Sequence, residues 1–197
     1  MQEHVILAFL WIIYCVLHSV FASRTFKKWV ASNSHGFNKY YRLYYTLFAA
    51  GAFIAIVYFQ MVLPSPFILG KGFSIPGWVL MITGAILMLV CIRKYFVSLT
   101  GLKRIIEERP VANELRVDGV HRYVRHPLYL GTFLFIWGLF LIIPHLSLLI
   151  SNLVIHIYTL IGIKLEEDKL IDEFGASYLS YKQNVPKLIP RLGKPKQ

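Results

Sequence analysis

Five long apolar stretches dominate this 197-residue chain, and they run over residues 4–22, 41–63, 76–99, 128–143 and 145–163. A bilayer core about 30 Å thick is crossed by about 20 apolar residues of α-helix, and each stretch approaches or meets that length. With 56% hydrophobic and only 16% charged residues, the composition is too apolar for a soluble domain of this size. We therefore expect an all-α, polytopic membrane protein with five transmembrane helices.

The basic residues are distributed unevenly between the loops. Of 21 Lys and Arg residues, 20 fall in the segment between the first two stretches, in residues 93–125, or after residue 163, and only Lys71 falls on the other side. The positive-inside rule places the N-terminus outside and the C-terminus in the cytoplasm of a cell inner or plasma membrane. The net charge of +11 then reflects topology and attraction to anionic lipid rather than nucleic acid, since no basic face with interleaved aromatics is present.

The apolar stretches also carry signals about processing and packing. The first has no basic n-region and no cleavage site before Arg24, so we expect a retained helix. Cys15 and Cys91 lie within predicted spans, where no disulfide is expected. Small residues predict close helix approach at two places: residues 49–52 with Ala55 in the second stretch, and Gly131 with Gly138 in the fourth.

Two polar clusters flank the hairpin formed by the last two stretches, with Arg125-His126-Pro127-Leu128-Tyr129 before it and Glu166-Glu167 after it. Because the chain turns at Pro144-His145, both clusters must meet at the same membrane interface. An Arg fork beside the free N–H groups of a helix N-terminus suits an anion such as a carboxylate, and Pro127 is a favoured first helical residue. Two acids at a helix C-terminus oppose the helix dipole, so they require a cation: Lys164, Lys169, Arg125, or a bound ammonium or sulfonium.

Simpler interpretations of the same residues remain open. Arg125 can reach to lipid headgroups while Tyr129 sits in the aromatic belt. The glutamates can form weak surface pairs with lysines. A metal site built from His121, His126 and Glu166 is disfavoured, because the histidine spacing does not fit a helical pair and no further ligands are evident, and we expect no metal.

Beyond Lys164 the chain continues in a helical pattern. Apolar residues recur at three- to five-residue steps while acids and lysines fill the other face, which predicts an amphipathic interfacial helix. Gly175 is expected to divide it, and Pro186 and Pro190 to end it. We expect one domain over residues 1–197, with a three-helix scaffold in residues 1–99 and the part that carries both polar clusters in residues 100–190.

A longer pattern then becomes recognisable in residues 119–131, 166–170, 174–181 and Val185-Pro186. Their order and spacing resemble the isoprenylcysteine carboxyl methyltransferase family of integral membrane enzymes, over about Asn113 to Pro190. The resemblance implies S-adenosylmethionine as methyl donor, with its carboxylate at the corner before the fourth span, its ammonium or sulfonium at Glu166, and its adenosine along residues 113–115 and His121. It implies cofactor-binding roles for Asn113, Leu115, His121, Arg125, His126, Pro127, Tyr129 and Glu166, and catalytic roles for Arg125 and Glu167.

Two departures from the family pattern bear on the methyl acceptor. His121 stands where members commonly have Tyr, and Gly162 stands where eukaryotic members have a substrate-contacting Arg. Residues 17–23 resemble a segment of related membrane proteins associated with thiol methylation and nitric-oxide reduction. The expected acceptor is therefore lipophilic or small: an isoprenylcysteine-type carboxylate, a thiol or a lipid amine. The competing hypothesis is a non-enzymatic membrane accessory or lipid-binding protein that retains the fold.

Overall fold

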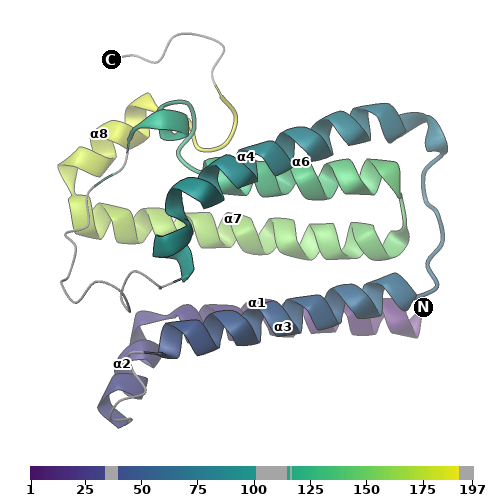
Figure 1. Cartoon of the computed structure of the whole chain (residues 1–197), viewed down its shortest axis with the longest axis horizontal. Coiled ribbons are helices and arrows are strands. Elements are labelled where there is room, and N and C mark those ends of the chain that lie inside the picture. The colour runs from purple at the N-terminus through teal and green to yellow at the C-terminus, as the bar shows by residue number, and fades with distance from the viewer. Residues whose placement is uncertain (34–39, 101–114, 116, 191–197) are drawn as a thin grey trace. The chain divides into compact units, whose positions relative to one another are not determined.

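The computed structural model describes residues 1–33, 40–100, 115 and 117–190 (Figure 1). The described part is all-α, as predicted, and its one strand-like pairing is an isolated bridge between Phe67 and His145. It contains seven α-helices and two short 3-10 turns: α1 (Gln2–Ala22), α2 (Arg24–Asn33), α3 (Tyr41–Val62), η2 (Lys71–Phe73), α4 (Ser74–Thr100), η3 (Gly119–Arg122), α6 (Pro127–Ile142), α7 (Leu146–Phe174) and α8 (Ala176–Asn184).

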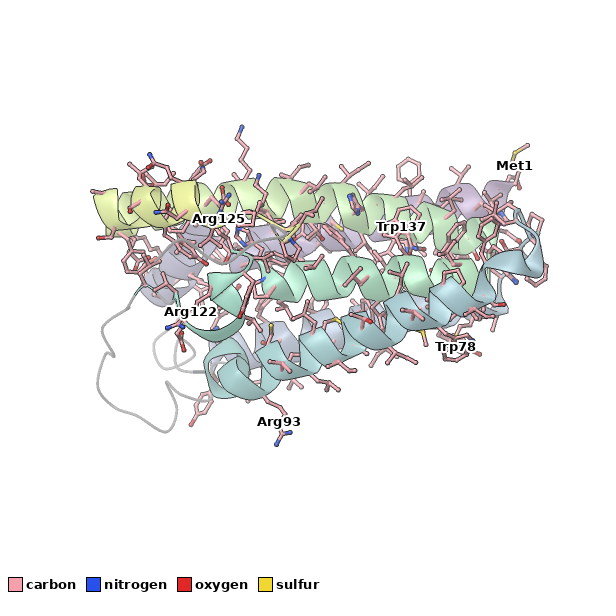
Figure 2. All side chains as sticks on the ribbon, turned by 90° about the horizontal axis from the view of Figure 1, so that it is seen from above. Met1, Trp78, Arg93, Arg122, Arg125 and Trp137 are labelled. Carbon is pink, nitrogen blue, oxygen red and sulfur yellow. The ribbon has the colours of Figure 1, made fainter. Side chains whose placement is uncertain are left out.

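Four of the described helices are long and apolar enough to cross a membrane: α1, α3, residues Ser74–Arg93 of α4, and α7. Figure 2 shows Trp78 near one end of this apolar part of α4 and Arg93 at the other. Helix α6 is apolar, but its 16 residues rise only about 24 Å, which is short of a bilayer core of about 30 Å. The membrane character is as predicted; four of the five expected spans reach full length in the described residues, and α6 is a shorter apolar helix.

The helix boundaries near the C-terminus follow local chemistry. Helix α6 ends at Ile142 and α7 begins at Leu146, so the chain turns at Pro144-His145 as predicted. Helix α7 continues without a break through the start of the predicted amphipathic segment. It ends before Gly175, whose φ of +53° lies in the region that favours glycine. Helix α8 ends at Asn184, ahead of Pro186, and both predicted breaks are confirmed.

The chain divides into two compact units. The first comprises Met1–Leu69, Tyr95–Val111 and Pro144–Ile155. Its core is the buried cluster of Leu7 and Trp11 from α1 with Ile56 and Leu63 from the end of α3. At this end Ser65 ties the connection after α3 to its neighbours, because its hydroxyl lies 3.1 Å from His4 Nε2 and accepts the Ser147 backbone N–H at 2.9 Å.

The second unit comprises Gly70–Lys94, Ala112–Ile143 and His156–Gln197. Within it, glycines let α4 and α6 touch backbone to backbone. A Cβ added to Gly84 would lie 2.5 Å from the Gly131 carbonyl oxygen, and one added to Gly77 would lie 2.9 Å from the Gly138 carbonyl oxygen. The predicted close approach at Gly131 and Gly138 is confirmed, and its partners are the two α4 glycines, which share the same seven-residue spacing.

In the second apolar stretch, α3 also lies close to α1, but not all of its small residues belong to the contact. A Cβ added to Gly51 of α3 would meet no atom within 4 Å. Ala49, Ala52 and Ala55 line a cavity beside α1 instead of a tight helix contact. Small residues permit close approach but do not enforce it, and here the same wall of the cavity also carries large aromatic side chains such as Phe48 and Tyr45.

Candidate functional site

The corner before α6 is fixed by its backbone. Pro127 is the first residue of α6 and is fully buried. The two residues before it pair with the segment after α8: the Arg125 N–H donates to the Pro186 carbonyl at 2.9 Å, and the His126 N–H donates to the Lys187 carbonyl at 3.1 Å. The start of α6 and the end of the described chain are therefore held together before any side chain is considered.

The Arg125 side chain is buried and almost fully occupied by protein acceptors. Its Nε donates to Glu167 Oε1 at 2.9 Å, and its Nη2 lies 2.8 Å from the same oxygen. Its Nη1 donates to the Lys182 carbonyl at 2.9 Å and also to the Val185 carbonyl. These carbonyls lie in the last turn of α8, where backbone acceptors have no partner within the helix and a cation is favoured. Arg125 thus caps α8 while it pairs with α7.

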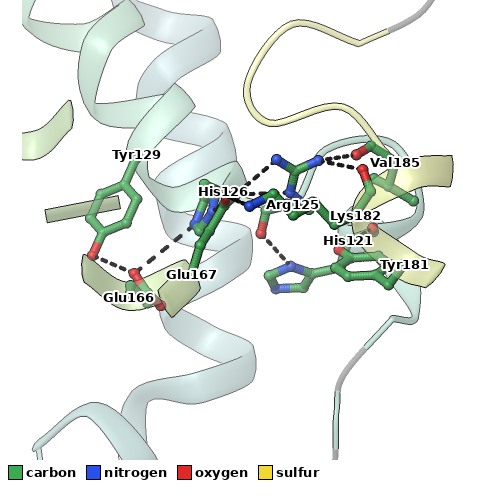
Figure 3. A network of polar contacts seen from close by, with 9 residues as sticks. All are labelled: His121, Arg125, His126, Tyr129, Glu166, Glu167, Tyr181, Lys182 and Val185. Atoms are coloured by element: carbon green, nitrogen blue, oxygen red, sulfur yellow. Dashed lines mark hydrogen bonds and ion pairs between the residues drawn. The ribbon is translucent and has the colours of Figure 1, made fainter. Parts of the chain in front are cut away.

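Glu167 is the common partner of three cationic or donor groups. Its side chain is only 4% exposed. Besides Arg125, it contacts His126 Nε2 at 3.0 Å and Lys182 Nζ at 3.1 Å. Since a carboxylate only accepts, His126 carries a proton on Nε2. We call Arg125, His126, Glu167 and Lys182 the buried cluster; it joins α7, α8 and the start of α6 (Figure 3).

A second layer braces the buried cluster. His121 Nδ1 donates to the Arg125 backbone carbonyl at 3.1 Å, and the Tyr181 hydroxyl donates to the His121 carbonyl at 2.7 Å. Tyr178 is 1% exposed. Burial, together with the nearby Glu167 carboxylate, raises the pKa of Tyr178 to about 12, so its phenol stays protonated at physiological pH.

On the other side of His126 the site is open. The Glu166 side chain is 46% exposed. Its Oε2 accepts the Tyr129 hydroxyl at 3.0 Å and lies 4.0 Å from His126 Nδ1. Figure 3 shows Tyr129 and Glu166 on one side of His126, and Arg125, Lys182 and Val185 on the other. We call Tyr129 and Glu166 the open pair: a carboxylate between an aromatic ring and an imidazole, which is suited to a cation.

The structure brings together most of the residues that the sequence singled out. Arg125, His126, Tyr129, Glu166 and Glu167 form one connected network, as the short hairpin predicted. His121 joins this network through the Arg125 backbone. Leu115 is half-buried, and Asn113 lies outside the described residues. Among the described residues, no group of three His, Cys, Asp or Glu side chains is placed to hold a metal ion.

Three residues of the network carry no role in the sequence-based prediction. Lys182 supplies a second cation to Glu167, Tyr181 bonds to His121, and the Val185 carbonyl receives Arg125. Tyr178 and Tyr181 belong to the recurring apolar face of the C-terminal segment, so their burial could have been anticipated. The contacts of Tyr181 with the His121 carbonyl and of Arg125 with the Val185 carbonyl could not be read from the sequence, because any residue offers the same backbone oxygen.

Comparison with known proteins identifies the family. The phospholipid methyltransferase family matches residues 73–177, which is more than half of the chain and includes both clusters of the hairpin. The chain belongs to this family of methyltransferases. A named relative, the protein-S-isoprenylcysteine O-methyltransferase of Schizosaccharomyces pombe, is 38% identical over 40% of this chain and 34% of its own length. The predicted family resemblance is therefore confirmed.

Other relatives align over more of the chain. The methanethiol S-methyltransferase of Pseudomonas deceptionensis is 29% identical over 91% of this chain and 70% of its own length. The methanethiol S-methyltransferase of Crocosphaera subtropica is 33% identical over 60% of this chain and 45% of its own length. The chain thus spans between 34% and 70% of the length of these three relatives. No solved structure matches the chain.

Proposed function

We propose that this protein is an integral membrane methyltransferase that uses S-adenosylmethionine and methylates a small thiol. The observation that carries the proposal is the contrast within the site: an exposed carboxylate, Glu166, stands beside a rigid buried cluster in a member of a methyltransferase family. A solvent-accessible acid held in place by Tyr129 is a ready partner for a cationic ligand.

The residues present fit the cationic part of the cofactor. S-adenosylmethionine, when bound, supplies a methyl group on a positively charged sulfur. Glu166 would hold the ammonium or sulfonium charge, and the Tyr129 hydroxyl orients the Glu166 carboxylate by a hydrogen bond of 3.0 Å. The carboxylate of the cofactor would meet the first backbone N–H groups of α6, at Leu128 and Tyr129, which have no acceptor within the helix.

Arg125 and Glu167 take a different role in this proposal from the catalytic one first assigned to them. Four of the five N–H donors of Arg125 are directed at protein acceptors, and Glu167 is saturated by Arg125, His126 and Lys182. We assign both as positioning residues. They hold the start of α6 and the Glu166 turn of α7 in register, since alignment of donor and nucleophile is the main task in a methyl transfer.

The thiol acceptor rests on two supports. The relatives that align over nine-tenths of the chain include methanethiol S-methyltransferases. In addition, Gly162 lies one helical turn before Glu166, and a Cβ there would meet no atom within 4 Å, so position 162 itself presents neither a charge nor a bulky side chain. In the reaction the acceptor sulfur would form a bond to the methyl carbon as the donor carbon–sulfur bond breaks, and the thiol proton would pass to water.

The test is product formation by the purified protein in detergent. We expect labelled methyl transfer from S-adenosylmethionine to methanethiol or another small thiol, identified by mass, and little transfer to a farnesylcysteine analogue or to phosphatidylethanolamine. Methylation of one of the latter two instead would overturn the thiol assignment alone. Absence of any cofactor binding by calorimetry, with the protein folded, would overturn the methyltransferase proposal as a whole.

We further propose that α6 provides a fifth crossing and that the site faces the cytoplasm, which the distribution of 20 of 21 basic residues supports. Ser180 lies on the exposed side of α8 and Ser65 in the connection after α3. A cysteine at position 180 should react with a membrane-impermeant maleimide only after the cells are lysed. Equal labelling in intact cells would place the site outside.

A further inference from the structure

The first unit contains a cavity that the methyltransferase site does not use. It lies between α1 and α3 and has a volume of about 240 Å³. Its walls are almost entirely hydrocarbon, with large apolar side chains from α1 and alanines from α3. The lining runs from Leu10 to Phe21 on α1 and from Tyr45 to Ile56 on α3.

The cavity exists because one wall is made of small residues. Ala49, Ala52 and Ala55 recur at three-residue steps and so lie along one face of α3. The space beside these three alanines is part of the cavity, whose opposite wall is formed by α1 side chains such as Leu10 and Ile13. Such a dry apolar cavity in a membrane helix pair is open to hydrocarbon rather than to water.

The cavity has one polar end. There the Tyr45 hydroxyl lies 2.8 Å from His18 Nδ1, and it also lies 3.3 Å from the His18 carbonyl oxygen. The Tyr14 ring stacks on His18 with centroids 5.9 Å apart. A molecule in this cavity therefore meets hydrocarbon along most of its length and hydrogen-bonding groups at one end.

The cavity is elongated along both helices, and we call it the α1–α3 groove. Its length matches one lipid chain. From Leu10 to Phe21 the helix rises about 16 Å, which is about half of a bilayer core of about 30 Å. A groove of one leaflet's depth, ending in polar groups, has the dimensions of an acyl chain that enters from its own leaflet.

The charge beyond the polar end selects the headgroup. The basic segment, here the described residues 23–33 and 40–42, contains four Lys or Arg residues and no Asp or Glu. This basic segment is anchored at the same end of the groove: the Tyr41 hydroxyl donates to the Phe21 carbonyl at 2.8 Å, and the Phe26 ring of α2 packs on Phe21 with centroids 5.1 Å apart. Clusters of cations beside a membrane helix attract anionic lipid.

We propose that the α1–α3 groove binds one anionic phospholipid, with an acyl chain along Ala49, Ala52 and Ala55 and its phosphate at the His18–Tyr45 end beside the basic segment. This site is separate from methyl transfer and does not depend on the proposed function. Its occupant is a bilayer lipid rather than a free phosphate, because the groove offers far more apolar surface than polar surface.

The experiment is native mass spectrometry of the full chain released from detergent micelles. The probes are dioleoylphosphatidylglycerol, dioleoylphosphatidylcholine and glycerol phosphate, each added separately. We expect a single adduct with phosphatidylglycerol, a weaker one with phosphatidylcholine and none with glycerol phosphate. Equal binding of the two lipids would overturn the anionic headgroup, and an adduct with glycerol phosphate of equal strength would overturn the need for the chain.

Variants locate the lipid. Ala52→Leu fills the groove, and it should lower phosphatidylglycerol binding about fivefold or more, by about 1 kcal/mol. Its matched control is Ala50→Leu, an exposed neighbour outside the groove, which should bind as the wild type does. Tyr45→Phe, which removes the polar end without adding volume, should reduce the preference for phosphatidylglycerol, whereas Tyr44→Phe should not. If Ala52→Leu and Tyr45→Phe both bind like the wild type, the assignment is overturned.

Discussion

Glu166 and Glu167 are neighbours in the chain, yet their side chains are 46% and 4% exposed. Successive residues on an α-helix point about 100° apart, so α7 turns one carboxylate into the buried cluster and the other toward the open pair. The buried carboxylate, Glu167, is neutralised by Arg125 and Lys182. The Glu166 carboxylate accepts the Tyr129 hydroxyl and lies 4.0 Å from His126 Nδ1. The comparison teaches that helical phase turns one of two identical neighbouring side chains into a buried ion pair and leaves the other as an exposed carboxylate.

The largest expected effect is the loss of stability when the buried cluster is disrupted. Arg125→Ala leaves Glu167 buried with one cation fewer and removes the cap of α8, so the free energy of unfolding should fall by about 3–5 kcal/mol. Thermal unfolding in detergent, followed by circular dichroism, measures this change. The matched control is Arg122→Ala, an exposed arginine in η3, which should unfold like the wild type. Equal stability of both variants would contradict the structural role of Arg125.

Lys182 makes the next largest contribution on the buried side. It is 38% exposed and contacts one oxygen of Glu167, so solvent screens part of the pair. Lys182→Met keeps the aliphatic stem and should cost about 1 kcal/mol of unfolding free energy. Lys169→Met, at an exposed lysine on α7, serves as control with no expected change. A loss as large as that of Arg125→Ala would mean that the cluster depends on both cations equally.

The sequence was sufficient to predict which residues meet at the candidate site, but not which of the two glutamates is buried. The apolar stretches and the Pro144-His145 turn predicted that Arg125 and the glutamates converge, because a short hairpin cannot separate its ends. Which glutamate is buried depends on the phase of α7 relative to α8. That phase is set by contacts such as Arg125 with the Lys182 and Val185 carbonyls, which no residue pattern records.

The same limit applies to the details of helix packing and to the length of the fifth apolar helix. Glycine pairs bring α4 and α6 together, whereas the alanines of α3 leave a cavity, and only the partner helix distinguishes these outcomes. Helix α6 begins at Pro127 and ends at Ile142, so its capping residues, rather than its hydropathy, set a length below that of a full span.

The smallest expected effect comes from a substitution in the open pair. Tyr129→Phe removes one hydrogen bond to an exposed carboxylate and keeps the ring, so cofactor affinity should fall about threefold. Stability should be unchanged within about 0.5 kcal/mol. Tyr123→Phe, an exposed tyrosine outside the network, controls for loss of a phenol at the same surface. Calorimetric titration with S-adenosylmethionine measures the affinity. If Tyr129→Phe destabilises the protein without loss of affinity, Tyr129 is a structural residue rather than a cofactor-binding one.

The most direct test of the central claim compares Glu166→Gln with Glu167→Gln by calorimetric titration with S-adenosylmethionine and with its demethylated product, alongside thermal unfolding. We predict that Glu166→Gln unfolds like the wild type and loses about tenfold in affinity for S-adenosylmethionine, with a smaller loss for the product, which lacks the sulfonium charge. Glu167→Gln should instead be destabilised. If Glu166→Gln binds S-adenosylmethionine as tightly as the wild type, Glu166 is not the cofactor carboxylate and the account fails.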